Sequence, residues 1–565
     1  MKRALVPALG LALSTILAAT PACERVPAAR PRSIAPVRPP LRPSPEQQSA
    51  AAALLAGPNW YRHAIFYEVN VRSFQDSNGD GYGDLNGLTS RLDYLKDIGV
   101  DALWLMPIMP SPFADSGYDV TDYRAIDPVY GTMADFDRLL AETKARGLRV
   151  FMDLVLNHTS IEHPWFRESR RSRTNPKANW YVWSDSDERD DIGCGTHSAI
   201  FGESPWTFEP TRQQYYFHRF YPEQPDLNYR EPAVAQEMLD TARFWLERGV
   251  AGFRCDVAGL LFETASSCSL VPETLAYLRS LRRVIDSFPD RATVAEPAEL
   301  TNSTPYFGNG TDMFHMAFDF AYGYFWGVAF ASGDRKIIED AMTTASRYPA
   351  GAQDALVIGS HDVGRAWQSA GGDARRYRGA ALLQMTMRGT PFVYYGEEVA
   401  LRPGVEIRVD PRDAARTPMT WTRAVPNHGF TTGTPWIPFG YAPAETSVEA
   451  QDSDPDSMLS FYRSLLAFRR GHRVWGTGTS RLLSVDDRAI VAFVRENEDE
   501  RYLVTVNLAP EAREGAAPGA VSRGGRLVFG EGRLTVDGDT TRIRLGGHGH
   551  AVFELPRRDL GPMTD

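Results

Sequence analysis

The sequence predicts an α/β fold: a (β/α)8 TIM barrel with an inserted subdomain after its third strand and a C-terminal antiparallel β-sandwich domain. The first observation is that short apolar runs from Trp60 onward alternate with amphipathic stretches of helical period, such as EMLDTARFWLERG. The second is that there are eight such runs: residues 64–71, 102–108, 149–156, 252–257, 292–297, 316–320, 355–360 and 391–396. Parallel strands buried on both faces have this nearly continuous apolar character, and eight of them with crossover helices form a closed barrel.

Two further segments interrupt or follow this alternation. Residues 159–228, after the third run, are too many for one crossover helix and carry many aromatic and turn residues, so we predict an inserted subdomain there. After about residue 475 apolar and polar residues alternate in short runs separated by turns, which is typical of antiparallel strands. We therefore divide the folded part into a barrel domain over 58–475 and a β domain over 476–557.

The N-terminus has the composition of a targeting segment followed by a linker. Residues 1–22 have a basic start, a short apolar run and small residues before a cleavage point, which predicts a secretory signal. Cys23 directly follows Ala22, as in a bacterial lipoprotein signal; ordinary cleavage near Ala22 is the alternative. Residues 23–57 are rich in Pro and Arg, so we expect an extended linker. We therefore expect export, as a periplasmic, outer-membrane or cell-surface lipoprotein attached to the membrane through Cys23, or as a secreted protein.

The composition indicates which classes of ligand the protein could bind and which cysteines could form a disulfide. The net charge of -10 argues against a nucleic-acid binder, which would show a basic patch or stripe. The 12 Trp, 23 Tyr and 28 Phe residues are enough to line a sugar site. Cys194 and Cys268 could pair in an oxidising compartment, whereas Cys255 lies inside a predicted strand and is expected to be a small buried residue. The oligomeric state is open, and we expect a monomer.

Three carboxyl groups stand where predicted barrel strands end. Asp256 ends the fourth strand, Glu296 ends the fifth, and Asp362 follows the seventh. Because the carboxyl ends of barrel strands share one face, these groups should converge on one cleft. One carboxylate can attack a substrate, one can donate and recover a proton, and one can hold the substrate. These are the needs of retaining glycoside chemistry.

The chain resembles the alpha-amylase superfamily of glycoside hydrolases (family thirteen) over about residues 58–557. The resemblance rests on motifs that occur in the superfamily's order: DLVLNH (153–158), GFRCD (252–256), AEP around Glu296 and SHD (360–362). It implies that Asp256 is the nucleophile, that Glu296 is the general acid and then the base, and that Asp362 grips sugar hydroxyls while the ring distorts.

The nucleophile and the acid need different protonation states. Arg254, two residues before Asp256 on the same face of the strand, should supply the positive charge that lowers the pKa of Asp256. We expect Asp153 to brace Arg254. Glu296 has to stay protonated until the substrate arrives, and nearby carboxylates with partial burial should raise its pKa.

The resemblance also implies residues that bind the reacting glucose. His158 and His361 would bind hydroxyls, and Tyr118 would be the stacking platform under the ring. Ser360 departs from the superfamily, which commonly has Asn before His-Asp; the His-Asp pair itself is intact.

Asp119 would bind the far end of the same glucose and close the pocket. The resemblance implies that it pairs with an arginine in the loop after the eighth strand, Arg416 or, as the second choice, Arg412. Such a charge pair excludes chains that would run through an open cleft. Short oligosaccharides are therefore the expected substrates.

The segment QPDLN (224–228) resembles the marker of the oligo-1,6-glucosidase subgroup. We therefore predict an exo-acting retaining α-glucosidase that hydrolyses terminal α-glucosidic bonds through a covalent glucosyl-enzyme intermediate. Val257, after the nucleophile, is associated in this subgroup with α-1,6 linkages and also occurs in other branches. The stretch YFGNGTDMFHMAFDF (306–320) resembles trehalose synthases, so isomerisation of maltose or transglucosylation with the same catalytic residues is the alternative. A non-catalytic sugar-binding or transporter-associated homologue is the third possibility.

The loop QDSNGDGYGDL (75–85) follows the first predicted strand. Its positions from Asp76 fit the pattern D-x-[DN]-x-[DN]-G that supplies oxygen ligands to a cation, but Gly87 stands where a calcium sensor needs Glu. The resemblance implies one structural Ca2+ here, the only cofactor we expect. Its implied ligands are Asp76, Asn78, Asp80, Asp84 and the carbonyl of Tyr82. A solvated acidic turn is the alternative.

Overall fold

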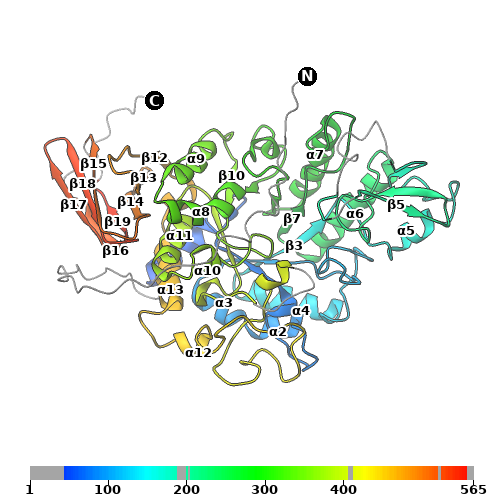
Figure 1. Cartoon of the computed structure of the whole chain (residues 1–565), viewed down its shortest axis with the longest axis horizontal. Coiled ribbons are helices and arrows are strands. Elements are labelled where there is room, and N and C mark those ends of the chain that lie inside the picture. Colours follow the sequence, from blue (N-terminus) through cyan, green and yellow to red (C-terminus); the bar gives the residue numbers. More distant parts are fainter. Residues whose placement is uncertain (1–43, 188–198, 202–203, 405–410, 520–523, 557–565) are drawn as a thin grey trace, which may run out of the picture. The chain divides into compact units, whose positions relative to one another are not determined.

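A computed structural model of the chain describes residues 44–187, 199–201, 204–404, 411–519 and 524–556. In this part of the chain eight parallel strands pair in the order β1-β2-β3-β7-β8-β9-β10-β11, and β11 returns to β1. Figure 1 labels β3, β7 and β10 of this barrel. The strands are β1 (Phe66–Val69), β2 (Ala102–Leu105), β3 (Arg149–Val155), β7 (Gly252–Asp256), β8 (Ala292–Ala295), β9 (Met316–Phe318), β10 (Gln353–Leu356) and β11 (Thr390–Tyr394). Each overlaps one of the eight apolar runs, with β10 and β11 beginning before theirs, so the predicted closed barrel is confirmed.

Side-chain alternation along the strands separates an apolar interior from a charged rim. Phe66, Phe151 and Phe392 come from three strands and meet in one buried cluster. The ring of Phe66 lies 4.3 Å from that of Phe392 and 4.9 Å from that of Phe151. Alternate residues share one face of a strand. Glu68, two residues after Phe66, and Asp153, two residues after Phe151, therefore also point inward. The barrel therefore carries aromatic rings below and carboxylates at the carboxyl ends of its strands.

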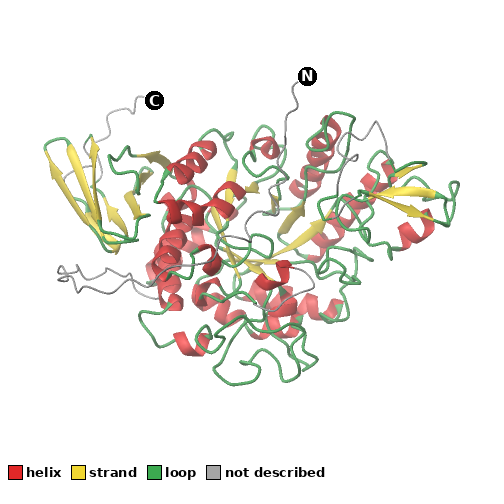
Figure 2. Ribbon diagram, in the orientation of Figure 1, coloured by secondary structure: helices red, strands yellow, loops and turns green. Residues whose placement is uncertain are grey.

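α-Helices connect most consecutive barrel strands (Figure 2), whereas the connection from β8 to β9 contains only a short 3-10 helix, Thr304–Phe307. α6 shows the local rules: Glu231 caps the first turn through the backbone N–H of Ala233, Pro232 takes the first position, and Gly249 ends the helix at φ 112°. The helices of the barrel region are α2 (Leu85–Ser90), α3 (Leu92–Ile98), α4 (Met133–Ala145), α6 (Pro232–Arg248), α7 (Pro272–Asp286), α8 (Phe320–Ser332), α9 (Lys336–Ala345), α10 (Ala366–Ser369), α11 (Ala374–Thr386), α12 (Val448–Gln451), α13 (Met458–Arg469) and α14 (Arg473–Thr477).

The segment 159–228 contains a small sheet of its own. Its described elements are α5 (Pro164–Ser169), β4 (Trp183–Ser184), β5 (Trp206–Glu209) and β6 (Gln214–Phe217). The strands pair antiparallel in the order β4-β6-β5. The segment returns to the barrel through an antiparallel bridge between His158 and Asp226, which brings the QPDLN motif beside the end of β3.

The C-terminal strands form two antiparallel sheets, as predicted. They are β12 (Thr479–Leu482), β13 (Ile490–Glu496), β14 (Arg501–Asn507), β15 (Arg513–Pro518), β16 (Arg526–Gly530), β17 (Arg533–Asp537), β18 (Thr540–Leu545) and β19 (His550–Glu554). One sheet has the order β12-β13-β14-β19-β16 and the other β15-β18-β17. Leu503 and Phe553 of the first sheet share a buried cluster with Ile543 and Leu545 of the second, so the two sheets pack face to face.

The predicted extended linker is wrong for its last part. Residues Pro45–Leu54 form helix α1. Ser44 and Gln47 make a reciprocal capping box at its start, and a run of alanines favours helix over extended chain. The predicted signal and Cys23 lie outside the described residues. Within the described ranges, no helix combines the length and apolar character needed to cross a membrane.

The cysteines divide into two kinds. Cys255 is a buried free thiol inside β7, as expected. Cys268 is disulfide-bonded. Cys194, which the sequence suggested as its partner, lies outside the described residues.

Candidate active site

The three carboxyls expected to react lie on neighbouring parts of the barrel rim. Asp256 is the last residue of β7, Glu296 directly follows β8, and Asp362 lies in the loop after β10. β7 pairs in parallel with β8, with Cys255 opposite Ala295. The strand ends therefore bring Asp256 and Glu296 side by side.

One buried guanidinium joins the carboxyls of three strands. Arg254 Nη1 lies 2.7 Å from Asp153 Oδ1 and 2.5 Å from Asp256 Oδ1, and its Nη2 lies 2.8 Å from Glu296 Oε2. Arg254 is 1% exposed, so water screens these contacts weakly. Asp153 braces Arg254 as expected from the sequence. The shared cation holds Asp256 and Glu296 a short distance apart, an arrangement that would suit retaining chemistry.

The structure corrects the expected pKa of Asp256. Burial raises it to about 6, and the opposing charge of Arg254 lowers it only in part. Burial, opposed by Arg254, also raises the pKa of Glu296 to about 7, to which the charges of Asp256 and Asp362 add. The direction for Glu296 is the predicted one. Between about pH 6 and 7, Asp256 is mostly ionised while Glu296 is mostly protonated.

The residue after Asp256 is strained. Val257 has φ 34°, a conformation that a β-branched residue rarely adopts. Its backbone N–H donates to Glu296 Oε2 at 2.8 Å. This turn therefore helps to fix Glu296 beside Asp256.

His361 lies between two carboxylates. Its Nδ1 is 2.5 Å from Glu68 Oε1 and its Nε2 is 2.9 Å from Asp362 Oδ2. Burial alone would lower the pKa of His361, but these carboxylates raise it to about 9. Burial alone would raise the pKa of Asp362, but His361 and two arginines hold it well below its ordinary range. Both shifts favour an imidazolium–carboxylate pair between His361 and Asp362 at neutral pH.

The predicted pairing of Asp119 with an arginine is wrong. Asp119 is fully buried and accepts hydrogen bonds from Ser111 Oγ (2.7 Å) and from the backbone N–H groups of Ala114 and Asp115 (3.0 and 3.1 Å). Its carboxylate therefore holds the loop after β2 in shape.

Asp115, four residues earlier, makes the charge pair instead. Its Oδ1 lies 2.5 Å from Arg412 Nη2. Arg412 and Arg416 also reach Asp362 Oδ1, at 3.5 and 3.3 Å. Arg416 donates to Ser116 Oγ at 2.6 Å. The ion pair is therefore made by Arg412, the second choice from the sequence, with Asp115. Arg412 and Arg416 together hold Asp362 in place.

The QPDLN motif contributes a buried amide. Gln224 Nε2 lies 3.1 Å from Asp115 Oδ2 and 3.0 Å from His158 Nε2. Burial lowers the pKa of His158 to about 3, so its ring is neutral. Gln224 therefore positions both Asp115 and His158, and the hydroxyl-binding role of His158 stays a prediction.

Tyr118 lies against the same histidine as Asp362. Its hydroxyl is 2.8 Å from His361 Nε2 and 3.1 Å from Asp153 Oδ2. Its ring stacks on His361 with 5.6 Å between centroids and 14° between planes. The stacking role of Tyr118 under a sugar also stays a prediction.

Three residues were missed as members of the site: Glu68, Asp115 and Gln224. Glu68 had a visible signal, because it is a carboxylate inside the apolar run AIFYEVNV. Gln224 stood in a motif used only to assign the subgroup. Nothing in the local sequence separates Asp115 from Asp119, since both occupy one short loop.

The acidic loop after β1 is held by its own backbone. Asp76 accepts hydrogen bonds from the N–H groups of Gly79 (2.7 Å) and Gly81 (2.9 Å). Gly81 has φ 95°, and a Cβ there would lie 1.9 Å from the carbonyl oxygen of Thr434, so the position requires glycine. Asp84 caps α2 by accepting from Gly87 N–H at 2.7 Å.

The oxygen donors of this loop suit Ca2+ chemically. Asn78 and Asp80 bond to each other at 3.0 Å in an exposed part of the loop. Among the described residues, no three His, Cys, Asp or Glu side chains are grouped so that they could hold a metal ion. The calcium site with ligands from Asp76, Asn78, Asp80, Tyr82 and Asp84 stays a prediction.

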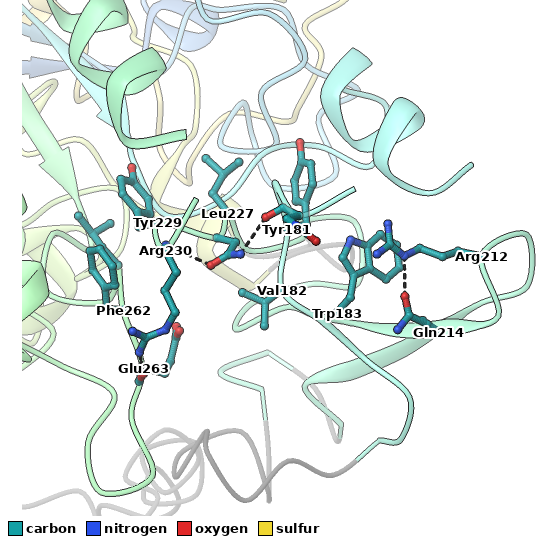
Figure 3. Close-up of a pocket in the computed structure, with 13 residues that line it drawn as sticks. Tyr181, Val182, Trp183, Arg212, Gln214, Leu227, Tyr229, Arg230, Phe262 and Glu263 are labelled. Carbon is teal, nitrogen blue, oxygen red and sulfur yellow. Dashed lines mark hydrogen bonds between the residues drawn. The ribbon is translucent and has the colours of Figure 1, made fainter. Parts of the chain in front are cut away.

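A cavity of about 260 Å³ between the inserted segment and the loop after β7 lies apart from these carboxyls (Figure 3). Its polar side chains are engaged by the protein: Arg212 donates to Gln214 at 2.7 Å and lies 4.3 Å above the ring of Trp183. Trp183 also stacks on Phe166. We therefore place the chemistry at the barrel rim.

Two family models match this chain one after the other. The family model described as "Alpha amylase, catalytic domain" matches residues 68–478. A second model, "Maltogenic Amylase, C-terminal domain", matches residues 480–552. The matched boundary falls at the start of the C-terminal sheets.

Named relatives cover most of the chain. Trehalose synthase of Thermus thermophilus is 38% identical over 88% of this chain, which spans only 56% of that protein. The Rhizobium meliloti protein named "Probable alpha-glucosidase" is 37% identical over 80% of this chain and 90% of its own length. The crystal structure of the α-glucosyl transfer enzyme XgtA superimposes with a TM-score of 0.79 at 34% identity, covering 88% of this chain and 99% of that one.

Proposed function

Because the chain belongs to the alpha-amylase family of glycoside hydrolases, we propose that it is an exo-acting, retaining α-glucosidase that releases terminal α-glucosyl residues from short oligosaccharides. The observation that carries the proposal is Arg254 bridging Asp256 and Glu296, whose pKa values are about 6 and about 7. A nucleophile and an acid in different protonation states are what the first step needs.

The steps follow from these groups. Asp256 attacks the anomeric carbon while Glu296 gives its proton to the departing glycosidic oxygen, which leaves a glucosyl ester on Asp256. Glu296, now ionised, takes a proton from the incoming water, which attacks the same carbon and restores Asp256. Each step inverts the carbon, so the configuration is retained overall.

An ion pair beside Asp362 supports exo action. Asp115 and Arg412 form an ion pair that is linked to Asp362 through the same guanidinium. We propose that this pair, rather than Asp119 with Arg416, bounds the non-reducing end of the substrate. A chain that extended beyond the terminal glucose would have to displace it.

A second candidate is isomerisation of maltose to trehalose. The observation that favours it is the likeness to the Thermus thermophilus trehalose synthase. The two reactions share the glucosyl ester and differ in its acceptor: water in hydrolysis, the retained glucose in isomerisation.

Product analysis separates the two candidates. We propose incubating the purified full chain with maltose, isomaltose, sucrose and trehalose and identifying the products by chromatography, with Asp256→Asn as the inactive control. Free glucose from maltose or isomaltose supports hydrolysis and also reports the linkage. Trehalose from maltose without free glucose supports the isomerase and refutes the hydrolase.

A further inference from the structure

The carboxyl of Glu68 takes no part in the steps above, although it lies within the barrel. Glu68 is on β1, three strands around the barrel from Asp256 on β7, and is fully buried. A buried carboxylate is costly unless a cation or hydrogen bonds compensate it. Its position therefore needs an explanation.

Its main partner is His361. Glu68 Oε1 lies 2.5 Å from His361 Nδ1 and 3.3 Å from the backbone N of the same residue. On the other side of the ring, His361 Nε2 faces Asp362 Oδ2 at 2.9 Å. A neutral imidazole has one N–H, so one of these carboxylates would face a bare nitrogen lone pair. An imidazolium donates to both.

We propose that Glu68 is a positioning residue that keeps His361 doubly protonated, so that His361 holds Asp362 in place by a charged hydrogen bond throughout the reaction. The inference rests on the proposed function for the role of Asp362. The protonation state of His361 can be measured without any turnover.

The other groups around His361 are compatible with this state. Tyr118 can donate its hydroxyl proton to Asp153 Oδ2, so that it does not compete for Nε2 as a donor. Trp104 presents its ring edge-on at 5.8 Å. Asp153 adds negative charge near the ring. All of these neighbours favour or tolerate a positive imidazole.

The groups that face Glu68 and Asp362 complete the charge balance. Arg412 and Arg416 reach Asp362 on the oxygen that His361 does not contact. Glu397, after β11, faces the same buried region, and burial raises its pKa well above the ordinary range, which disfavours a second negative charge beside Glu68. Glu68 is therefore the carboxylate that compensates His361 at Nδ1.

The test uses Glu68→Gln, which keeps the size and an acceptor oxygen but removes the charge. If activity follows the imidazolium fraction, and the pKa of His361 falls from about 9 to an ordinary value of about 6.5, kcat/KM relative to wild type should be nearly unchanged at about pH 5.5. It should fall about 30-fold at about pH 8. Glu68→Asp, which retains the charge, should restore much of the activity at the higher pH.

The matched control is Glu398→Gln. Glu398 is also fully buried, and it accepts from the hydroxyls of Tyr67 and Tyr94. This variant should have the wild-type pH dependence. A reduction for Glu68→Gln that is the same at both pH values would overturn the proposal, because it would indicate a structural effect alone.

An NMR readout separates this inference from the proposed function. In 15N-histidine-labelled full-length protein at about pH 8, the wild type and Glu398→Gln should show an imidazolium that Glu68→Gln and His361→Asn both lack. A neutral His361 in the wild type would overturn the inference whether or not any sugar is turned over. Absence of turnover with the imidazolium present would refute only the proposed function.

Discussion

The barrel rim and the loop after β1 both gather carboxylates but hold them differently. The rim carboxylates are Asp153, Asp256, Glu296 and Asp362, and the loop carboxylates are Asp76, Asp80 and Asp84. The rim carboxylates bond to the cationic side chains of Arg254 and His361 inside the barrel. The loop carboxylates bond mainly to backbone N–H groups of their own loop.

The difference shows what each arrangement can do. A carboxylate that shares a buried cation with its neighbours has its pKa set by burial and charge, and can therefore take part in proton transfer. A carboxylate bonded to backbone N–H groups fixes the shape of the chain. Substitutions on the rim should therefore affect turnover most, and substitutions in the loop should affect stability.

The largest effect is expected for Glu296→Gln. The amide can still accept from Val257 N–H but cannot donate a proton to the leaving group, so kcat should fall by about 10²- to 10⁴-fold. Steady-state kinetics on the substrate identified by chromatography measure it. Asp80→Asn in the exposed part of the loop is the control and should retain wild-type kcat. An equal loss of kcat in Glu296→Gln and Asp80→Asn would contradict the different roles given to the rim and loop carboxylates.

The next effect is on stability. Arg254→Ala leaves Asp153 and Asp256 buried without their cation and should lower the free energy of unfolding by about 3–5 kcal/mol. Arg248→Ala is the matched control: its ion pair with Asp137 lies at the surface and should cost less than about 1 kcal/mol. Urea denaturation measures both. A cost for Arg254→Ala as small as that for Arg248→Ala would contradict the role of the shared cation.

The pH dependence of kcat/KM should be narrow. Asp256 has to be ionised, so the rate should fall as the pH drops below about 6. Glu296 has to be protonated, so the rate should fall as the pH rises above about 7. Each limb should approach a tenfold loss per pH unit. A profile that is flat from pH 5 to 9 would show that these groups do not limit the reaction.

The smallest effect is expected in the loop. Asp84→Ala removes the cap of α2 and should cost about 1 kcal/mol of stability with little change in kcat. The predicted Ca2+ is tested in the same assay: a chelator should lower the Tm of the wild type more than that of Asp84→Ala. No response of the wild type to the chelator would show that the calcium prediction is wrong.

The sequence predicts most of the fold because hydrophobic periodicity is local. Each barrel strand overlaps one of the apolar runs, although β10 and β11 begin before theirs, and Asp256, Glu296 and Asp362 stand at or after strand ends as predicted. The linker prediction failed at α1, where a capping box and alanines outweighed the surrounding prolines. The assignment of the ion pair to Asp119 failed because it depends on which side chain reaches a loop almost three hundred residues away, and that side chain is Asp115.

The pKa of Asp256 shows a second limit. The sequence places Arg254 two residues away and thus gives the sign of that interaction. It does not give the extent of burial, and burial is the larger influence on this carboxyl. The local sequence identifies the charged neighbours of a carboxyl group, whereas its burial in the folded barrel determines how far each neighbour shifts its pKa.

The central claim is that Asp256 forms a covalent glucosyl ester while Glu296 supplies the proton. The most direct test treats Glu296→Gln with α-glucosyl fluoride, whose leaving group departs without an acid, followed by mass spectrometry of the intact chain and its peptides. We expect one added glucosyl group on the peptide that contains Asp256, and none in the double variant with Asp256→Asn. Label on another residue, or product released with inverted configuration and no label, would contradict the claim.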